Sequence, residues 1–131
     1  MFLDASAIVA ILAREDDADR LSTALSRAPL KMTSALAVWE AATGFARQRG
    51  MALSEARAVV QSFVVRAKVQ LVPIGANEYE MALDAFDRFG KGRHPARLNM
   101  GDCFAYACAK THRVPLLFKG DDFSQTDIPV A

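Results

Sequence analysis

Short apolar runs alternate with longer helix-forming stretches along this chain, and this alternation constrains its fold more than any other feature. Four runs have the length and composition of strands, at residues 1–3, 30–33, 69–74 and 114–118, and residues 127–130 are expected to add a short edge strand. Strands that alternate with helices pair in parallel through right-handed crossovers. We therefore predict an α/β fold with three layers (α/β/α) around a twisted, mainly parallel sheet of roughly 4–5 strands.

Capping residues mark the ends of several predicted helices. Ser34 can cap the third helix, Gly50 can end it, and Asn99 can cap the last one. The pattern predicts helices that begin near Ser6, Glu15, Ala35, Ser54, Asn77 and Asp102. In the fourth of these helices, the residues expected to face inward are Ala58, Val59, Phe63 and Val64.

The size of the chain and its composition indicate one folded domain, which we place at residues 1–131. Its 131 residues, 52% of them hydrophobic, are enough to form a buried core. No apolar run approaches the ~20 residues of a membrane span, and a signal peptide is missing, so we expect a cytoplasmic protein. Cys103 and Cys108 suit buried thiols better than a disulfide, and with only His94 and His112 besides, no zinc-ligand spacing can be assembled.

Carboxylates occur where the predicted strands end, which is the edge where open parallel sheets bind their ligands. Asp4 follows the first run, Glu40 lies early in the helix after the second, and Asp102 begins the helix that leads into the fourth. Asp121 and Asp122 follow the fourth run itself. We therefore expect these side chains to meet at one edge of the sheet.

Each of these acids also has a simpler local explanation. Asp4 can cap the first helix, Asp102 favours the start of the last one, and residues 120–122 have the composition of a turn. Glu40, beside Trp39 in a segment of apolar and small residues, has no local role other than that of a solvated side chain. As a set, however, carboxylates without a counter-charge raise one another's pKa, and a hard divalent cation such as Mg²⁺, which prefers oxygen ligands, resolves this.

Several segments resemble those of PIN-domain ribonucleases of the VapC type, the toxin half of bacterial toxin–antitoxin pairs. The matching segments are Leu3–Ala7, Trp39–Glu40, Leu98–Phe104 and, most specific, Pro115–Ile128, while Gly90–His94 is similar to one branch of the family. The likeness covers essentially the whole chain. It implies a PIN-like fold and a metal-dependent endoribonuclease of the bacterial cytoplasm. Such an enzyme cleaves RNA phosphodiesters with a metal-activated water and inhibits growth until its antitoxin binds.

The resemblance also implies which residues form the site. The acids in catalytic positions are Asp4, Glu40, Asp102 and Asp122, with Asp121 as the second choice for the last position. Mg²⁺, with Mn²⁺ as a substitute, would be held directly by Asp4 and Asp102, and by Glu40 through a water. Ser6 would orient Asp4 or a water from behind the metal ligands.

A cationic loop before the last helix is a candidate RNA-binding element. Its candidate residues are Lys91, Arg93, His94 and Arg97, and Lys119, beside the acidic turn, is a further one. Phosphate contacts of this kind would supply affinity and positioning. The alternative is a solvated loop without a role in binding.

The resemblance implies a cognate VapB-type antitoxin as partner, besides the RNA substrate. It further implies a homodimer that forms a heterotetramer or larger assembly with the antitoxin, with DNA contacted only through the antitoxin and no membrane partner. The sequence adds one observation, because Phe63, Val64 and Val65 are consecutive and cannot all face one core from a helix. An exposed side there would suit a partner, and burial inside a thick sandwich is the alternative.

Two other functions are compatible with the same acids. A phosphatase of the haloacid-dehalogenase type also has an aspartate after its first strand, but it needs a second one two residues later, where this chain has Ser6. A non-catalytic α/β binding module, in which the acids are caps and solvated groups, is the other alternative.

Overall fold

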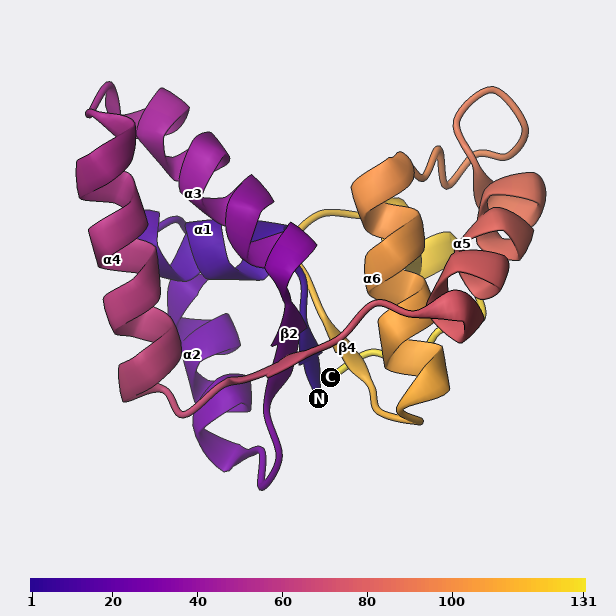
Figure 1. Ribbon diagram of the computed structural model, residues 1–131, viewed down its shortest axis with the longest axis horizontal. Coiled ribbons are helices and arrows are strands. Elements are labelled where there is room, and N and C mark those ends of the chain that lie inside the picture. Colours follow the sequence, from indigo (N-terminus) through magenta and orange to yellow (C-terminus); the bar gives the residue numbers. More distant parts are fainter.

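A four-stranded parallel sheet lies at the centre of the computed structural model, which describes all of residues 1–131 (Figure 1). The strands are β1 (Phe2–Leu3), β2 (Met32–Ser34), β3 (Gln70–Val72) and β4 (Leu116–Leu117), in the order β3-β2-β1-β4. Phe2 pairs with Met32 on one side and with Leu116 on the other, so β1 occupies the interior of the sheet. The predicted α/β fold with a parallel sheet is confirmed.

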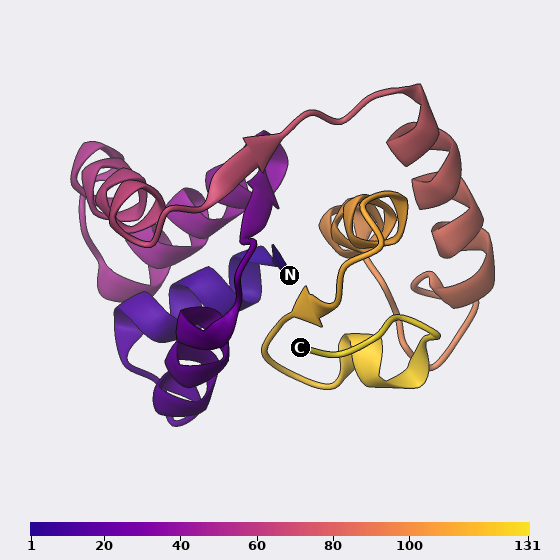
Figure 2. The ribbon, with the colours of Figure 1, turned by 90° about the horizontal axis from the view of Figure 1, so that it is seen from below.

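Helices cover both faces of the sheet. One face carries α1 (Ala5–Ala13), α2 (Ala18–Arg27), α3 (Ala35–Arg49) and α4 (Leu53–Arg66), and the other carries α5 (Ala76–Phe89) and α6 (Met100–Thr111) (Figures 1 and 2). Successive residues of a strand point to opposite faces. Accordingly Phe2 belongs to the core under α5 and α6, whereas Leu3 belongs to the core under α1 and α4. No helix has the length and apolar character needed to cross a membrane.

The predicted caps form where the sequence places them. The Ser34 hydroxyl accepts a hydrogen bond from the N–H of Ala37 at 3.1 Å, and Gly50 ends α3 with the left-handed φ of 61° that glycine favours. Cys103 and Cys108 are buried free thiols, as expected, and burial raises their pKa values to about 11 and about 12.

The C-terminal segment differs from the prediction of an edge strand over 127–130. It forms only an isolated parallel bridge between Leu116 and Val130. Pro129 interrupts the segment, because its nitrogen has no hydrogen to donate to a neighbouring strand. The predicted strands at 30–33 and 114–118 are also displaced or shortened, to Met32–Ser34 and Leu116–Leu117.

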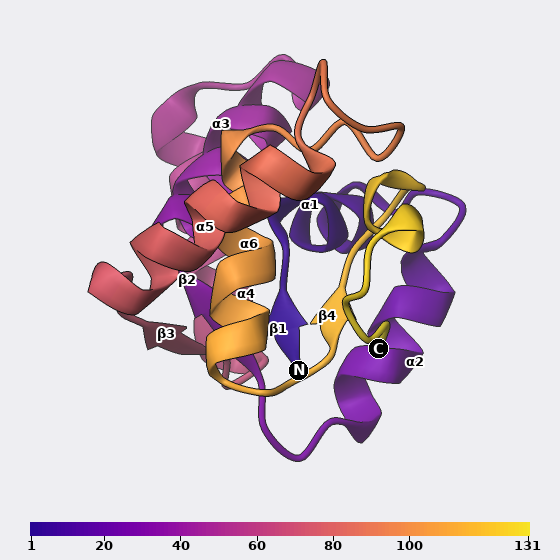
Figure 3. The same ribbon diagram turned by 90° about the vertical axis from the view of Figure 1, so that its right-hand side faces the viewer.

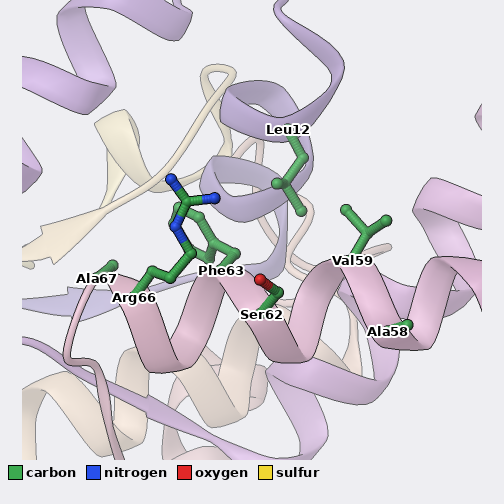
Figure 4. A pocket seen from close by; sticks show the side chains of 7 residues that line it. All are labelled: Leu12, Ala58, Val59, Ser62, Phe63, Arg66 and Ala67. Atoms are coloured by element: carbon green, nitrogen blue, oxygen red, sulfur yellow. The ribbon is translucent and has the colours of Figure 1, made fainter.

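The inward face predicted for α4 was wrong in part. Ala56, Val60 and Val64 are buried at a spacing of four residues, whereas Ala58 and Val59 are exposed. Val65 is 75% exposed, so the apolar triplet at 63–65 does present one side to solvent. Phe63, also predicted to face inward, is partly buried and packs against the core. Together with the exposed Val59 it lines a hollow of about 700 Å³ against Leu12 of α1, with Arg66 extending over it (Figure 4).

Candidate active site

Asp4 lies directly after β1, at the C-terminal edge of the sheet. Its backbone N–H donates to the carbonyl of Leu117 at 3.0 Å, and its side chain is only 4% exposed. Oδ2 accepts hydrogen bonds from the N–H of Ser6 at 2.9 Å and from the Ser6 hydroxyl at 2.5 Å. Burial raises the pKa of this carboxyl, and the hydrogen bonds from Ser6 oppose the shift. Asp4 is thus the cap of α1 and a buried, oriented acid at the same time.

Glu40 reaches the same edge from the second turn of α3. Burial raises the pKa of its half-buried carboxyl, and the negative charge of Asp4 raises it further. The carboxylate rests against the first turn of α6, where Gly101 has no side chain. A Cβ built on Gly101 would lie 2.1 Å from Oε1 and 2.4 Å from Oε2 of Glu40, so the glycine provides the space that this carboxylate occupies.

Asp102 completes the first turn of α6, and its carboxyl also has a raised pKa. Its Oδ2 accepts from the N–H of Asn99 at 2.8 Å, while the Asn99 side chain accepts from the N–H of Asp102 at 2.9 Å, which forms a capping box. Burial raises the pKa of Asp102 to about 7, and the charges of Asp4, Asp122 and Glu40 add to the shift.

The two aspartates of the turn after β4 behave differently. The negative charge of Asp122 raises the pKa values of both Asp4 and Asp102. The carbonyl of Asp121 instead accepts from the hydroxyl of Ser124 at 2.5 Å and closes the turn before the 3₁₀ helix Asp122–Gln125. Asp122 is therefore the aspartate of this turn whose charge acts on the other acids of the site.

These acids therefore gather on the C-terminal side of the sheet, and α1, α3 and α6 all begin on that side (Figures 1 and 3). None of the four carboxylates of Asp4, Glu40, Asp102 and Asp122 forms an ion pair. No three acid, histidine or cysteine side chains lie close enough together to form a ready-made metal site. The donor set nevertheless fits Mg²⁺, which takes one or two carboxylates and completes its shell with water and phosphate oxygens.

The cationic loop connects α5 to α6 and projects beyond these two helices (Figure 1). Lys91 and Arg97 are exposed and form no ion pair, but Arg93 pairs with Asp87 at 2.8 Å. His94 has a structural role, because its Nδ1 accepts from the N–H of Ala96 at 3.1 Å and its ring packs edge-on against Phe89. Lys119 is paired with Glu15, in a hollow on the other side of the acids.

Two features of this site were not predicted from the sequence. The role of Gly101 could have been suspected from the sequence. A glycine in the first turn of a helix lowers helix stability by up to about 1 kcal/mol relative to alanine, which suggests that a side chain would not fit there. Arg47 and Gln48 line the hollow beside Ser6 and Glu40. Nothing in the sequence predicts this, because their position depends on how α1 and α3 pack.

Comparison with known proteins agrees with this architecture. Residues 1–129 match the PIN domain family. A VapC ribonuclease of Rhizobium meliloti (strain 1021) is 42% identical, with 97% of this chain and 98% of the relative covered. A Ribonuclease VapC of Mycolicibacterium smegmatis is 41% identical, with 98% and 97% covered.

Two solved structures share the fold at lower identity. Mycobacterium tuberculosis VapC20, described as a Sarcin-Ricin loop cleaving toxin, superimposes with a TM-score of 0.77 at 21% identity, covering 99% of this chain and 97% of that one. A toxin–antitoxin complex from Klebsiella pneumoniae gives a TM-score of 0.71 at 15% identity, covering 99% and 95%.

The parallel sheet with acids at its C-terminal edge is thus that of a PIN-domain protein, and the chain belongs to this family of metal-dependent nucleases. The curated relatives, which match over nearly the full length, identify the group within this family. The chain is an endoribonuclease of the VapC type, which confirms the resemblance seen in its sequence.

Proposed function

We propose that this chain is the toxin of a toxin–antitoxin pair and cleaves RNA phosphodiesters with Mg²⁺ at the acid cluster, for which Mn²⁺ can substitute. The proposal treats residues 1–131 as one PIN domain. The observation that carries it is the set of carboxylates Asp4, Glu40, Asp102 and Asp122, none of which forms an ion pair. Burial and neighbouring negative charges raise the pKa values of Asp4, Glu40 and Asp102. A cation at this place would relieve the repulsion and favour the ionised form of each acid.

The residues of the site have different roles in this proposal. Asp4 and Asp102 would hold the ion directly, and Glu40 would do so through a water. When bound, the ion supplies Lewis-acid activation of the phosphate and of the attacking water. The two donors of Ser6 fix the orientation of Asp4 before any ligand binds, so little reorganisation is needed on binding. We assign the fourth acidic position to Asp122, because its charge acts on both Asp4 and Asp102.

Part of the cationic loop is assigned to RNA binding. Lys91 and Arg97 are exposed and unpaired, so their charges are available to phosphate oxygens. Arg93 must exchange its partner Asp87 for RNA, and His94 supports the loop from inside. We therefore expect Lys91 and Arg97 to contribute more to binding than the other two.

An antitoxin is the proposed protein partner, and the exposed apolar surfaces suit it. A hollow of about 360 Å³ between α5 and α6 is lined by Tyr79, Leu83, Phe86 and Met100, all of them exposed. Met100 stands two residues before Asp102, so a segment bound there would lie beside the acid cluster. Large exposed apolar patches mark interaction sites. The same reasoning assigns the exposed side of α4, around Val65, to a homodimer or to the larger assembly with the antitoxin.

The phosphatase alternative gains no support from the site. Ser6 occupies the place where that chemistry needs a second acid, and its hydroxyl is engaged with Asp4. The alternative of a non-catalytic module conflicts with the family assignment. The local roles that it predicts do occur, since Asp4 caps α1 and Asp102 supports the start of α6 behind its cap Asn99.

The test is cleavage of single-stranded RNA by the purified protein. We expect cleavage with Mg²⁺, none with EDTA, and none by the Asp4→Asn or Asp102→Asn variants, while a phosphomonoester stays intact. Asparagine keeps the shape and the capping oxygen of aspartate, so these variants should remain folded. Asp122→Asn and Asp121→Asn form a matched pair that identifies the fourth acid. Full activity of a folded Asp102→Asn variant would disprove the assignment of the site.

A further inference from the structure

A polar hollow lies directly beside the acid cluster, between α1, α3 and the turn after β4. Its volume is about 470 Å³, and the residues that matter for its chemistry are Ser6, Glu15, Glu40, Arg47, Gln48 and Lys119. Only two of the nine residues that line it are hydrophobic, whereas all seven residues around the hollow between α5 and α6 are. The polar hollow is therefore suited to a charged, hydrogen-bonding ligand.

One wall of this hollow is a chain of hydrogen bonds that leads back to the site. Gln48 donates from Nε2 to Glu15 at 2.7 Å, and Glu15 forms an ion pair with the ammonium group of Lys119. The backbone N–H of Lys119 donates to the hydroxyl of Ser6 at 3.0 Å, and that hydroxyl donates to Asp4. The wall is thus fixed relative to Asp4.

Arg47 supplies the free positive charge of the hollow. It is exposed and forms neither an ion pair nor a side-chain hydrogen bond, whereas the other cation, Lys119, is neutralised by Glu15. On α3, Glu40, Gly44 and Arg47 follow one another at the spacing of a single helix face. Because Gly44 has no side chain, the surface between the acid and the arginine stays open.

We propose that this hollow is the subsite for the RNA nucleotide next to the scissile phosphate, with Arg47 bound to the adjoining backbone phosphate. The proposal rests on the proposed ribonuclease function. Acids repel an RNA backbone, so a substrate whose scissile phosphate lies among them needs a cation on each side. Figure 1 shows the loop at 90–98, between α5 and α6, on the opposite side of the molecule from the last turn of α3, which holds Arg47. An RNA strand bound to both would therefore cross the acid cluster.

The experiment compares Arg47→Ala with Arg49→Ala. Both arginines are exposed and in the last turn of α3, but Arg49 does not line the hollow. Binding of a fluorescent single-stranded RNA to Asp102→Asn protein is followed by anisotropy over a range of salt concentrations. One lost phosphate contact lowers the slope of log K against log salt by about 0.7, so Arg47→Ala should show this change and weaker binding by several-fold. In the active protein, the same variant should raise KM while kcat is retained.

Different results would overturn the ribonuclease site and the Arg47 subsite. Absence of cleavage and of RNA binding in the unmodified protein would overturn the ribonuclease site itself. Cleavage by the unmodified protein, together with equal salt slopes and equal KM values for the folded Arg47→Ala and Arg49→Ala variants, would overturn the subsite alone.

Discussion

Gly101→Ala is the substitution that tests the geometry of the site most directly. The added methyl would start 2.1 Å from Oε1 of Glu40 and 2.5 Å from its Cδ. Carbon and oxygen atoms that are not bonded need about 3 Å or more, so the carboxylate must retreat by roughly 1 Å. A displacement of that size at a catalytic centre can cost about 100-fold in rate, or about 2.7 kcal/mol of transition-state stabilisation. We expect a loss of that order in kcat/KM for RNA cleavage.

Stability should change in the opposite direction. Alanine is favoured over glycine within a helix by about 0.5–1 kcal/mol, and only the flexible end of Glu40 has to move. Gly44→Ala is the control for stability, since its Cβ would meet Val9 at an ordinary 3.8 Å. Both variants should therefore keep or raise the melting temperature of the metal-free protein.

Cleavage kinetics and thermal unfolding together show whether Gly101→Ala acts by displacing the Glu40 carboxylate. Glu40→Asp draws the carboxylate back by one methylene, so Gly101→Ala should cost much less in that background than alone. An unchanged kcat/KM in Gly101→Ala would refute the reasoning. So would a loss of activity that comes with a lower melting temperature, since the cause would then be misfolding.

Three further predictions concern pH and hydrogen bonding. The pKa of Asp102 is about 7 in the fold against 3.8 in the unfolded chain, so the folded state loses stability as pH rises through this range. In metal-free protein at neutral pH, Asp102→Asn should be more stable by about 2 kcal/mol, a gain that disappears near pH 4 and shrinks when Mg²⁺ binds, as denaturant titrations will show. The pKa of Asp127 is shifted in the opposite direction. Partial burial raises this pKa, but hydrogen bonds, led by that from Tyr106, outweigh burial and lower it from 3.8 to about 2. Its side chain is 47% exposed, so after solvent screening Asp127→Asn should cost only about 1 kcal/mol at pH 7, and the difference should be lost as the pH falls through about 2. Ser6→Ala should lower the cleavage rate 10- to 100-fold, in the range of about 10–100 for lost support of a metal ligand, and a normal rate would remove Ser6 from its positioning role.

The shared edge of the acids could be predicted because it follows from topology. In a parallel sheet every strand ends on the same side, so Asp4 and Asp122 must lie there once the strands are recognised. The caps at Ser34 and Asn99 depend only on a few neighbouring residues, and they were predictable for that reason.

Features that depend on the packing of distant helices could not be predicted. The apolar residues of α4 occupy more than one side, and the sequence does not state which side meets the core. Trp39 is 64% exposed despite its apolar neighbours, because α3 turns its small residues Ala37 and Ala41 inward. The contact of Gly101 with Glu40 likewise requires α3 and α6 to meet, which no spacing along the chain encodes.

The position of β1 inside the sheet has a consequence for how the enzyme is made. β1 must pair with both β2 and β4, and β4 and Asp122 leave the ribosome long after Asp4. At bacterial synthesis rates the delay is on the order of ten seconds. Pairing between segments so far apart in sequence cannot begin before both exist. A growing chain therefore cannot assemble the acid cluster until β4 and Asp122 have been synthesised and have left the ribosome.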